Sequence, residues 1–219
     1  MRVIFESIFD VVYLIGVITL GVIMIKSSGG NPTRKLFGYM AVVLGAGDAF
    51  HLVPRIYSLI TDSFAENIVP LGIGKLITSV TMTFFYMMLY YVWRNRYNIT
   101  GERRTTGILW ALAAVRVILC LFPQNMWTAP VQPMFWGVLR NIPFTIMGII
   151  IIALFYREIK KHNDTVFRFM PLAIILSFGF YIPVVLWGDI YPTIGLLMIP
   201  KTMAYVWIVF MGYKLPLND

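Results

Sequence analysis

The segment LFGYMAVVLGAGDAFHLVPRIYSLI, residues 36–60, combines an apolar run long enough to cross a bilayer with three ionisable side chains. A spanning helix needs about 20 mostly apolar residues. Asp48, His51 and Arg55 follow each other at helical spacing, so an α-helix stacks them on one face. A charge at the bilayer centre costs roughly 2.5–3.5 kcal/mol, and such residues face a bundle interior or a wet cavity. We therefore expect this face to belong to a functional site.

The whole chain has the composition of an integral membrane protein. Of its 219 residues, 59% are hydrophobic and 13% are charged, whereas soluble domains are about 45–50% apolar and about 25% charged. The sequence predicts an all-α, seven-transmembrane-helix bundle in a single integral membrane domain, residues 1–219. The expected helices cover about 8–26, 36–59, 69–93, 106–122, 134–156, 166–187 and 193–213.

The charges between these helices predict the orientation of the chain. The loops after the first, third and fifth helices are rich in lysine and arginine, whereas the other loops hold Asp62, Glu66 and Asp189 and no basic residue. The positive-inside rule then places the N-terminus outside and the C-terminus in the cytoplasm. We expect a multi-pass protein of a prokaryotic plasma membrane. Because the basic residues behind the net charge of +8 lie mostly in these short loops, we expect no nucleic-acid partner.

The two halves of the chain resemble each other. LFGYM (36–40) is similar to VFRFM (166–170), Gly74 pairs with Gly195, and Gly21 pairs with Gly148. This pattern predicts three helices, a linking helix and three more helices in the same orientation, a 3+1+3 parallel repeat. Parallel repeats of this kind occur in sugar transporters.

The ionisable residues inside the expected helices concentrate in the outer half of the membrane. At 1.5 Å per helical residue, Asp48 lies near mid-membrane and His51 lies further out. We expect these two residues to be catalytic. The expected binding residues are Glu6, Asp10, Arg55, Lys75, Arg116, Arg140, Lys201 and Tyr205. Cations outnumber anions in this set, so the cavity should open outward and attract an anionic lipid headgroup or another small anion. We expect neither a metal nor another cofactor.

Each of these residues also has a purely structural interpretation. The basic residues near the outer helix ends could instead extend their side chains to the membrane interface and keep their charges in water. The acidic residues near the N-terminus could instead be solvated in the first turn of a helix, where the helix dipole favours negative charge. Arg116 and Lys201 are near the middle of their helices and could form structural ion pairs with Asp48 or Asp10. His51 could be a packed histidine of the core.

The segment LGAGDAF, residues 44–50, resembles the Gly-Asp-Ala-Phe/Leu motif of lysoplasmalogenases, which are polytopic membrane enzymes that cleave a vinyl-ether bond. The last helix, IPKTMAYVWIV (199–209), is loosely similar to the final helix of that family. The resemblance implies that Asp48 is a functional acid. The second acid of the family would fall at Ser177-Phe178 and a family histidine near Met82, and neither is present. The family tends to have eight helices, against seven expected here.

The resemblance and the cationic cavity together suggest a membrane-embedded hydrolase acting on a lysophospholipid or another anionic lipid headgroup. In that reaction Asp48 would orient His51, and His51 would activate water near a phosphate held by cations. Two other functions stay open. A transporter or receptor for a small anionic or lipid ligand fits the repeat and the helix-breaking prolines, and a retinal-binding opsin fits Lys201 in the middle of the seventh helix.

Overall fold

The computed structural model describes residues 2–188 and 190–216, except for the side chains of Arg2 and Pro192. Over these residues the chain is all-α, and seven helices are long and apolar enough to cross a membrane. The helices are α1 (Arg2–Lys26), α2 (Pro32–Thr61), α3 (Ile68–Arg96), α4 (Arg103–Leu121), α5 (Met134–His162), α6 (Met170–Trp187) and α7 (Met198–Tyr213), with short 3-10 helices η1 (Pro123–Asn125) and η2 (Pro192–Leu197). Seven candidate spans are thus confirmed.

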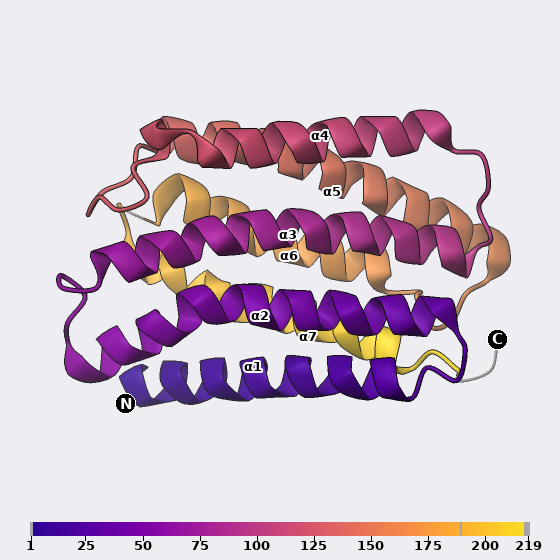
Figure 1. Cartoon of the computed structure of the whole chain (residues 1–219), viewed down its shortest axis with the longest axis horizontal. Helices are drawn as coiled ribbons and strands as arrows, with labels where there is room; N and C mark the ends of the chain where they lie inside the picture. The colour runs from indigo at the N-terminus through magenta and orange to yellow at the C-terminus, as the bar shows by residue number, and fades with distance from the viewer. Residues whose placement is uncertain (1, 189, 217–219) are drawn as a thin grey trace.

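The helices lie side by side along the long axis, and the chain begins and finishes at opposite ends of the bundle (Figure 1). In this view α1 to α4 form the front layer, with α5, α6 and α7 behind them. Each helix packs against the next, α3 also contacts α5, and α7 contacts both α1 and α2. We call the end where α1 begins the N-terminal end of the bundle, and the end where α7 finishes the C-terminal end.

Helix α1 begins at Arg2 rather than near residue 8, because its two acidic residues belong to the packed helix. Glu6 and Asp10 are both buried. The opposite face of the same helix is apolar and open, and Ile4 and Ile15 are each more than 60% exposed. A helix of a soluble protein buries its apolar face and exposes its polar face. Helix α1 does the reverse, as expected for a helix that contacts lipid.

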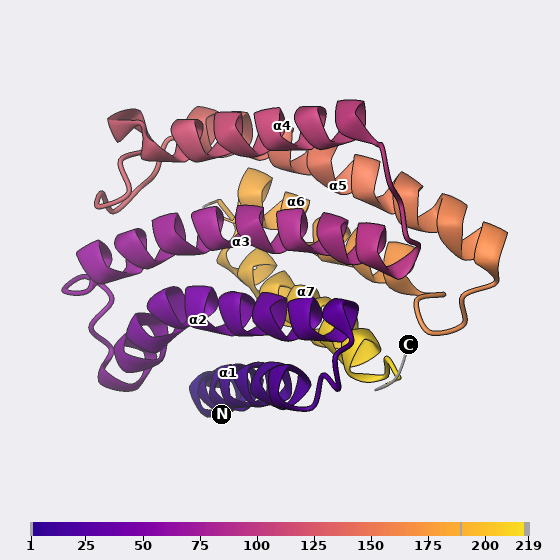
Figure 2. The same cartoon turned by 45° about the vertical axis from the view of Figure 1, so that its right-hand side comes forward.

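Close backbone contact fixes α1 against α2. A Cβ atom on Gly21 would meet the carbonyl oxygen of Gly38, and one on Gly38 would meet the carbonyl oxygen of Gly21. Small residues let membrane helices approach in this way. Further along, α2 contains Pro54, and its last turns bend away from the rest of the helix (Figure 2). A proline inside a helix removes one backbone hydrogen bond and causes such a kink.

Helices α2 and α3 are in close backbone contact at Gly74, where a Cβ atom would collide with the backbone of Phe50 and His51. We expect Gly74→Ala to lower the unfolding free energy by about 1–3 kcal/mol, the usual cost of overpacking. Gly107→Ala is the matched control, because nothing lies within 4 Å of a Cβ atom there, and an alanine should stabilise an open helical site by about 0.5–1 kcal/mol. Thermal unfolding of both purified variants measures the difference. Equal melting temperatures would contradict the close approach.

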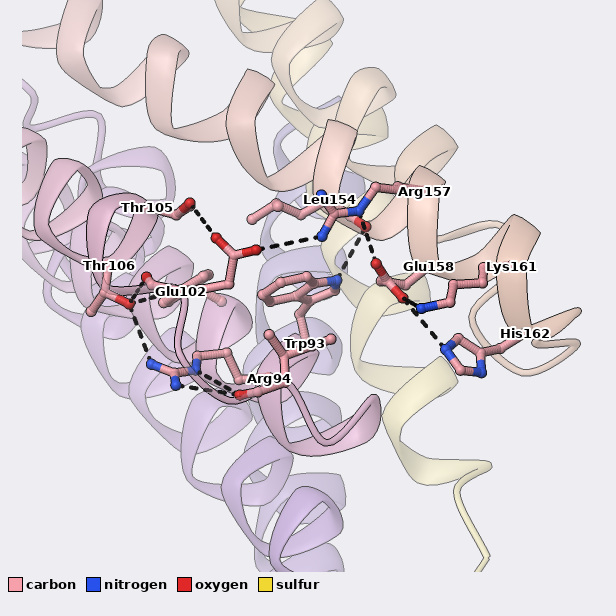
Figure 3. Close-up of polar contacts among 12 residues, drawn as sticks. Trp93, Arg94, Glu102, Thr105, Thr106, Leu154, Arg157, Glu158, Lys161 and His162 are labelled. Atoms are coloured by element: carbon pink, nitrogen blue, oxygen red, sulfur yellow. Dashed lines mark hydrogen bonds and ion pairs between the residues drawn. The ribbon is translucent and has the colours of Figure 1, made fainter.

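The C-terminal end of the bundle is held by a polar network between α3, α4 and α5 (Figure 3). The indole N–H of Trp93 donates to the carbonyl oxygen of Leu154 at 3.1 Å. Glu158 is buried and pairs with Arg157 at 2.8 Å, and its other carboxylate oxygen lies 3.4 Å from His162 Nε2. Together with the hydrogen bond from Arg94 on α3 to Thr106 on α4, which Figure 3 also shows, these contacts link the ends of the three helices.

Helix α6 begins at Met170, four residues later than expected, because Asp164 organises the preceding turn. Its Oδ1 accepts hydrogen bonds from the backbone N–H groups of Val166 and Phe167 at 2.9 and 3.1 Å. Its Oδ2 accepts from Arg96 Nε at 2.9 Å. Burial raises the pKa of the Asp164 carboxyl, but the bonds to Arg96 and to the backbone outweigh burial and hold the pKa below its ordinary value of 3.8.

Because the folded-state pKa of Asp164 is lowered, its ionised form stabilises the folded protein. This contribution is complete above the ordinary pKa of 3.8 and is lost as the pH falls through the lowered value. We expect Asp164→Asn to cost about 1.5–3 kcal/mol at neutral pH, the value of hydrogen bonds to a charged group. Unfolding measured from neutral to acidic pH should show this deficit shrinking below pH 3.8. A deficit that stays constant down to the lowest pH would contradict the role given to the carboxylate.

Candidate functional site

Two adjoining cavities lie toward the N-terminal end of the bundle. The smaller has a volume of about 80 Å³ and is lined by the carboxylates Glu6, Asp10 and Asp48; we call it the carboxylate chamber. The larger has a volume of about 280 Å³; we call it the cation chamber. Its basic lining residues are Arg55, Lys75, Arg116, Arg140 and Lys201.

The chambers adjoin each other, because six residues line both of them: His51, Arg55, Thr78, Gly195, Met198 and Lys201. All ten residues expected from the sequence to form a site line one chamber or the other. They come from six helices, namely α1, α2, α3, α4, α5 and α7. Asp189, which the sequence places in the loop before the last helix, lies outside the described residues.

Asp48, His51 and Arg55 all face the carboxylate chamber, in agreement with the shared helical face. Their partners differ from the expected arrangement. The phenol of Tyr13 on α1 donates a hydrogen bond to Asp48 Oδ2 at 2.6 Å. The ring nitrogen Nδ1 of His51 lies 3.4 Å from the carbonyl oxygen of Leu71, where α3 begins. Asp48 and His51 are thus held by different neighbours, and a water molecule or a ligand would have to connect them.

The two acidic residues of α1 have unequal partners. Glu6 forms an ion pair with Arg55 at 3.0 Å, which joins α1 to α2. This pairing explains why Arg55 is half-buried instead of extending to an interface. Asp10 lines the same chamber and is only 9% exposed, yet it has no hydrogen bond or ion pair among the residues that the structure describes. Its carboxylate faces the cavity.

Arg116 is the most buried cation of the site, at 2% exposure. Its guanidinium carbon lies 3.3 Å from the centroid of the Phe144 ring, a close cation–π contact. Two of its nitrogens, Nε and Nη1, are buried and have no hydrogen-bond partner in the described part of the chain. An ion pair with Asp48 or Asp10 is therefore absent from the described structure. A buried guanidinium with unused donors on a cavity wall has the chemistry of an anion-binding group.

Lys201 lies on the wall that the two chambers share. It is 8% exposed. Its ammonium nitrogen lies 4.8 Å from the ring centroid of Tyr181 and 5.3 Å from that of Tyr205. Within the described residues no carboxylate comes within ion-pair distance of Lys201. The structure therefore places this ammonium between the carboxylates of one chamber and the guanidinium of Arg116 in the other.

The remaining two cations lie at the rim of the cation chamber. Arg140 donates a hydrogen bond to Asn125 Oδ1 at 2.8 Å and stacks on the Trp127 ring, 4.2 Å from its centroid. Asn125 in turn donates to the carbonyl oxygen of Leu119 at 2.7 Å and so caps the end of α4. Arg140 thereby fixes the connection between α4 and α5. Lys75 lines the chamber from α3 and is exposed.

Sequence reasoning did not identify the aromatic wall of the cation chamber. Phe144, Tyr181 and Trp127 line it beside the basic residues. Phe144 follows Arg140 by one helical turn, so this spacing would have placed both on one face. Below this wall, Tyr86 packs edge-on against Phe144 with ring centroids 4.9 Å apart. These buried rings separate the chambers from the C-terminal end of the bundle.

No family model, curated protein or solved structure matched this chain when it was compared with them. The resemblance of residues 44–50 to the lysoplasmalogenase motif therefore stays a prediction. The chemistry of the site has to be argued from its own residues, which combine buried carboxyl groups with a larger cavity lined by arginine and lysine.

Proposed function

We propose that this protein is a membrane-embedded hydrolase that takes the headgroup of a lysophospholipid, or of another anionic amphiphile, into the cation chamber. The observation that carries the proposal is Arg116, whose buried Nε and Nη1 groups have no partner in the described structure. Burying N–H donors of a charged group without hydrogen-bond partners costs free energy. An anionic ligand that accepts hydrogen bonds from this guanidinium would remove that cost, and Lys201 borders the same space.

The carboxylate chamber supplies groups for hydrolysis. Cleavage by water needs one group that gives a proton to the leaving atom and one that accepts a proton from water. Asp48 and Asp10 line the same small cavity and come from different helices, so together they provide two carboxyl groups next to the anion site. Asp10 thus supplies a second acid, which the resemblance had led us to seek near Ser177. His51 lines both chambers, so its imidazole can exchange a proton with a group bound in either of them.

The proposal includes the orientation and the repeat. With the N-terminus outside, both chambers lie in the outer half of a prokaryotic plasma membrane. One observation agrees with the 3+1+3 repeat. Gly21 lets α1 pack closely on α2, the first two helices of the first half. Gly148 lets α5 pack closely on Phe178 of α6, the first two helices of the second half. The Gly74 and Gly195 pair is less alike, because a Cβ atom would collide with α2 at Gly74 and would meet nothing at Gly195.

The proposal is tested by incubating the purified protein in nanodiscs with lysophospholipids that carry ester, ether or vinyl-ether chains. Mass spectrometry of the lipids then measures the products. We expect time-dependent loss of at least one anionic lysolipid and appearance of its cleaved headgroup. Absence of turnover across the whole panel would contradict hydrolysis.

A transporter or receptor for the same ligands is the second candidate. The observation that favours it is the presence of prolines inside three helices that border the chambers, Pro54, Pro143 and Pro183. Such interruptions allow helices to bend around a site. Saturable binding without turnover in the same experiment would assign this function. A visible absorption band after addition of retinal, lost in Lys201→Arg, would instead assign the opsin function.

A further inference from the structure

The carboxylate chamber holds a buried acid that has no hydrogen bond or ion pair among the residues that the structure describes. Glu6 pairs with Arg55, and Asp48 accepts a hydrogen bond from Tyr13. Asp10 is 9% exposed, faces the chamber, and has neither kind of contact within the described residues. A buried carboxylate is stable only when hydrogen-bond donors or a cation satisfy it. A group that enters the chamber can supply them.

The ionisable side chains that line the carboxylate chamber also favour a cationic group there. Three acidic side chains, Glu6, Asp10 and Asp48, and two basic side chains, Arg55 and Lys201, line it. The carboxylates are therefore in excess by one. The neighbouring cation chamber has the opposite excess among its described lining residues. Because the two cavities share a wall at His51, Thr78 and Gly195, one small molecule can occupy both.

We propose that the site takes a zwitterion, with its anionic group in the cation chamber near Arg116 and a primary ammonium in the carboxylate chamber against Asp10 and Asp48. The proposal rests on the proposed function only for the anionic end of the ligand. A primary ammonium has three N–H donors, which suit two carboxylates in a confined space. A trimethylammonium group has no donor and is recognised by several aromatic faces, whereas Phe9 is the one benzene ring lining the described part of this chamber. The volume of about 80 Å³ also favours the smaller group.

Ligand variation on the wild-type protein tests the proposal without any substitution. Binding is measured in detergent micelles by a thermal-shift titration with four lysolipids of one chain length: lysophosphatidylethanolamine, its N-acetyl derivative, lysophosphatidylcholine and lysophosphatidylglycerol. We expect the free-amine lipid to bind at least about tenfold more tightly than the other three, equivalent to 1.4 kcal/mol. Equal affinity for the free amine and its N-acetyl derivative would overturn the ammonium site while leaving anion binding intact. Failure of every lysolipid to bind would overturn this inference and the proposed function together.

A pair of variants then assigns the preference to a residue. Asp10→Asn should abolish the tenfold preference for lysophosphatidylethanolamine over its N-acetyl derivative. Asp62→Asn is the matched control, because Asp62 is an exposed cap residue with a left-handed backbone that asparagine also adopts. Retention of the preference in Asp10→Asn would contradict the role of Asp10. If that variant does not fold, the N-acetyl comparison on the wild type still decides.

The ammonium and anion can belong to a lipid headgroup or to a free solute, and competition separates these sources. Phosphoethanolamine carries the same two groups without a chain. Displacement of the bound lysolipid by equimolar phosphoethanolamine would support a solute site. Displacement only at a large excess would support a lipid headgroup. Phosphoethanolamine that competes no better than inorganic phosphate at any concentration would contradict recognition of the ammonium.

Discussion

Asp48→Asn should reduce turnover of a lysophospholipid by at least about a hundredfold, because removing a group that transfers protons in the transition state typically costs 10²–10⁴ in rate. Asparagine keeps the shape of the side chain and still accepts the hydrogen bond from Tyr13, which is 2.6 Å long in the wild type. The helix packing around it should therefore persist. The loss is measured as the initial rate of headgroup release, with size-exclusion chromatography as the test of folding.

The control for this loss is Asp62→Asn, which removes the same charge from the exposed residue that caps the end of the same helix, outside both chambers. It should retain the wild-type rate. A folded Asp48→Asn variant with unchanged turnover would remove Asp48 from the chemistry and leave it a structural partner of Tyr13. Loss of activity in both variants would indicate a general effect of charge instead of a reaction at Asp48.

Arg116→Met should separate stability from function. The wild type buries a guanidinium with two unpaired nitrogens, and replacing buried charges with apolar residues of similar volume is often stabilising by about 1–4 kcal/mol. Loss of the cation–π contact with Phe144 offsets up to about 2 kcal/mol of this gain. We expect the unliganded variant to melt no lower than the wild type and to lose the stabilisation by anions. For the wild type that stabilisation is about 2.7 kcal/mol at a ligand concentration 100 times the Kd.

Thermal unfolding with and without lysophosphatidylglycerol measures both quantities. Arg104→Met is the matched control on the same helix, because Arg104 is exposed and lies outside both chambers. It should change neither the melting temperature nor the response to the lipid. A large fall in the melting temperature of unliganded Arg116→Met would mean that the guanidinium holds the bundle together, which contradicts its role as an anion site awaiting a ligand.

Hydropathy alone was enough to find the seven helices, because each expected span lies mostly within one observed helix. The helix ends were less accurate where polar groups are buried. The start of α1 was placed too late because acidic residues usually mark a solvated helix end, whereas Glu6 here is neutralised by Arg55 from α2. The start of α6 was placed too early because the hydrogen bonds of Asp164 form only when its turn meets Arg96.

The ionisable residues that line the chambers were predictable because a charged residue inside an apolar helix has few stable positions other than a shared polar interior. Their partners were not predictable. Tyr13 reaches Asp48 because glycines bring α1 and α2 into backbone contact, and His51 turns toward Leu71 where α2 approaches α3. These pairings depend on the register between helices. Helical periodicity within one chain segment carries no information on that register.

We propose that the ionisable side chains from separate helices surround a wet space that is accessible from outside the cell. Cysteine accessibility tests it most directly. Ser79→Cys and Gly137→Cys place a thiol on the wall of the cation chamber, and Ser28→Cys places one in the loop after α1 at the other end of the bundle. All three are made in a Cys120→Ser background, which removes the one native thiol.

An impermeant, negatively charged methanethiosulfonate is applied to intact cells. We predict rapid labelling of both chamber positions, protection of both by lysophospholipid, and labelling of Ser28→Cys only after the cells are permeabilised. The opposite pattern, with Ser28→Cys labelled in intact cells and the two chamber positions unreactive, would contradict an outward-facing wet chamber.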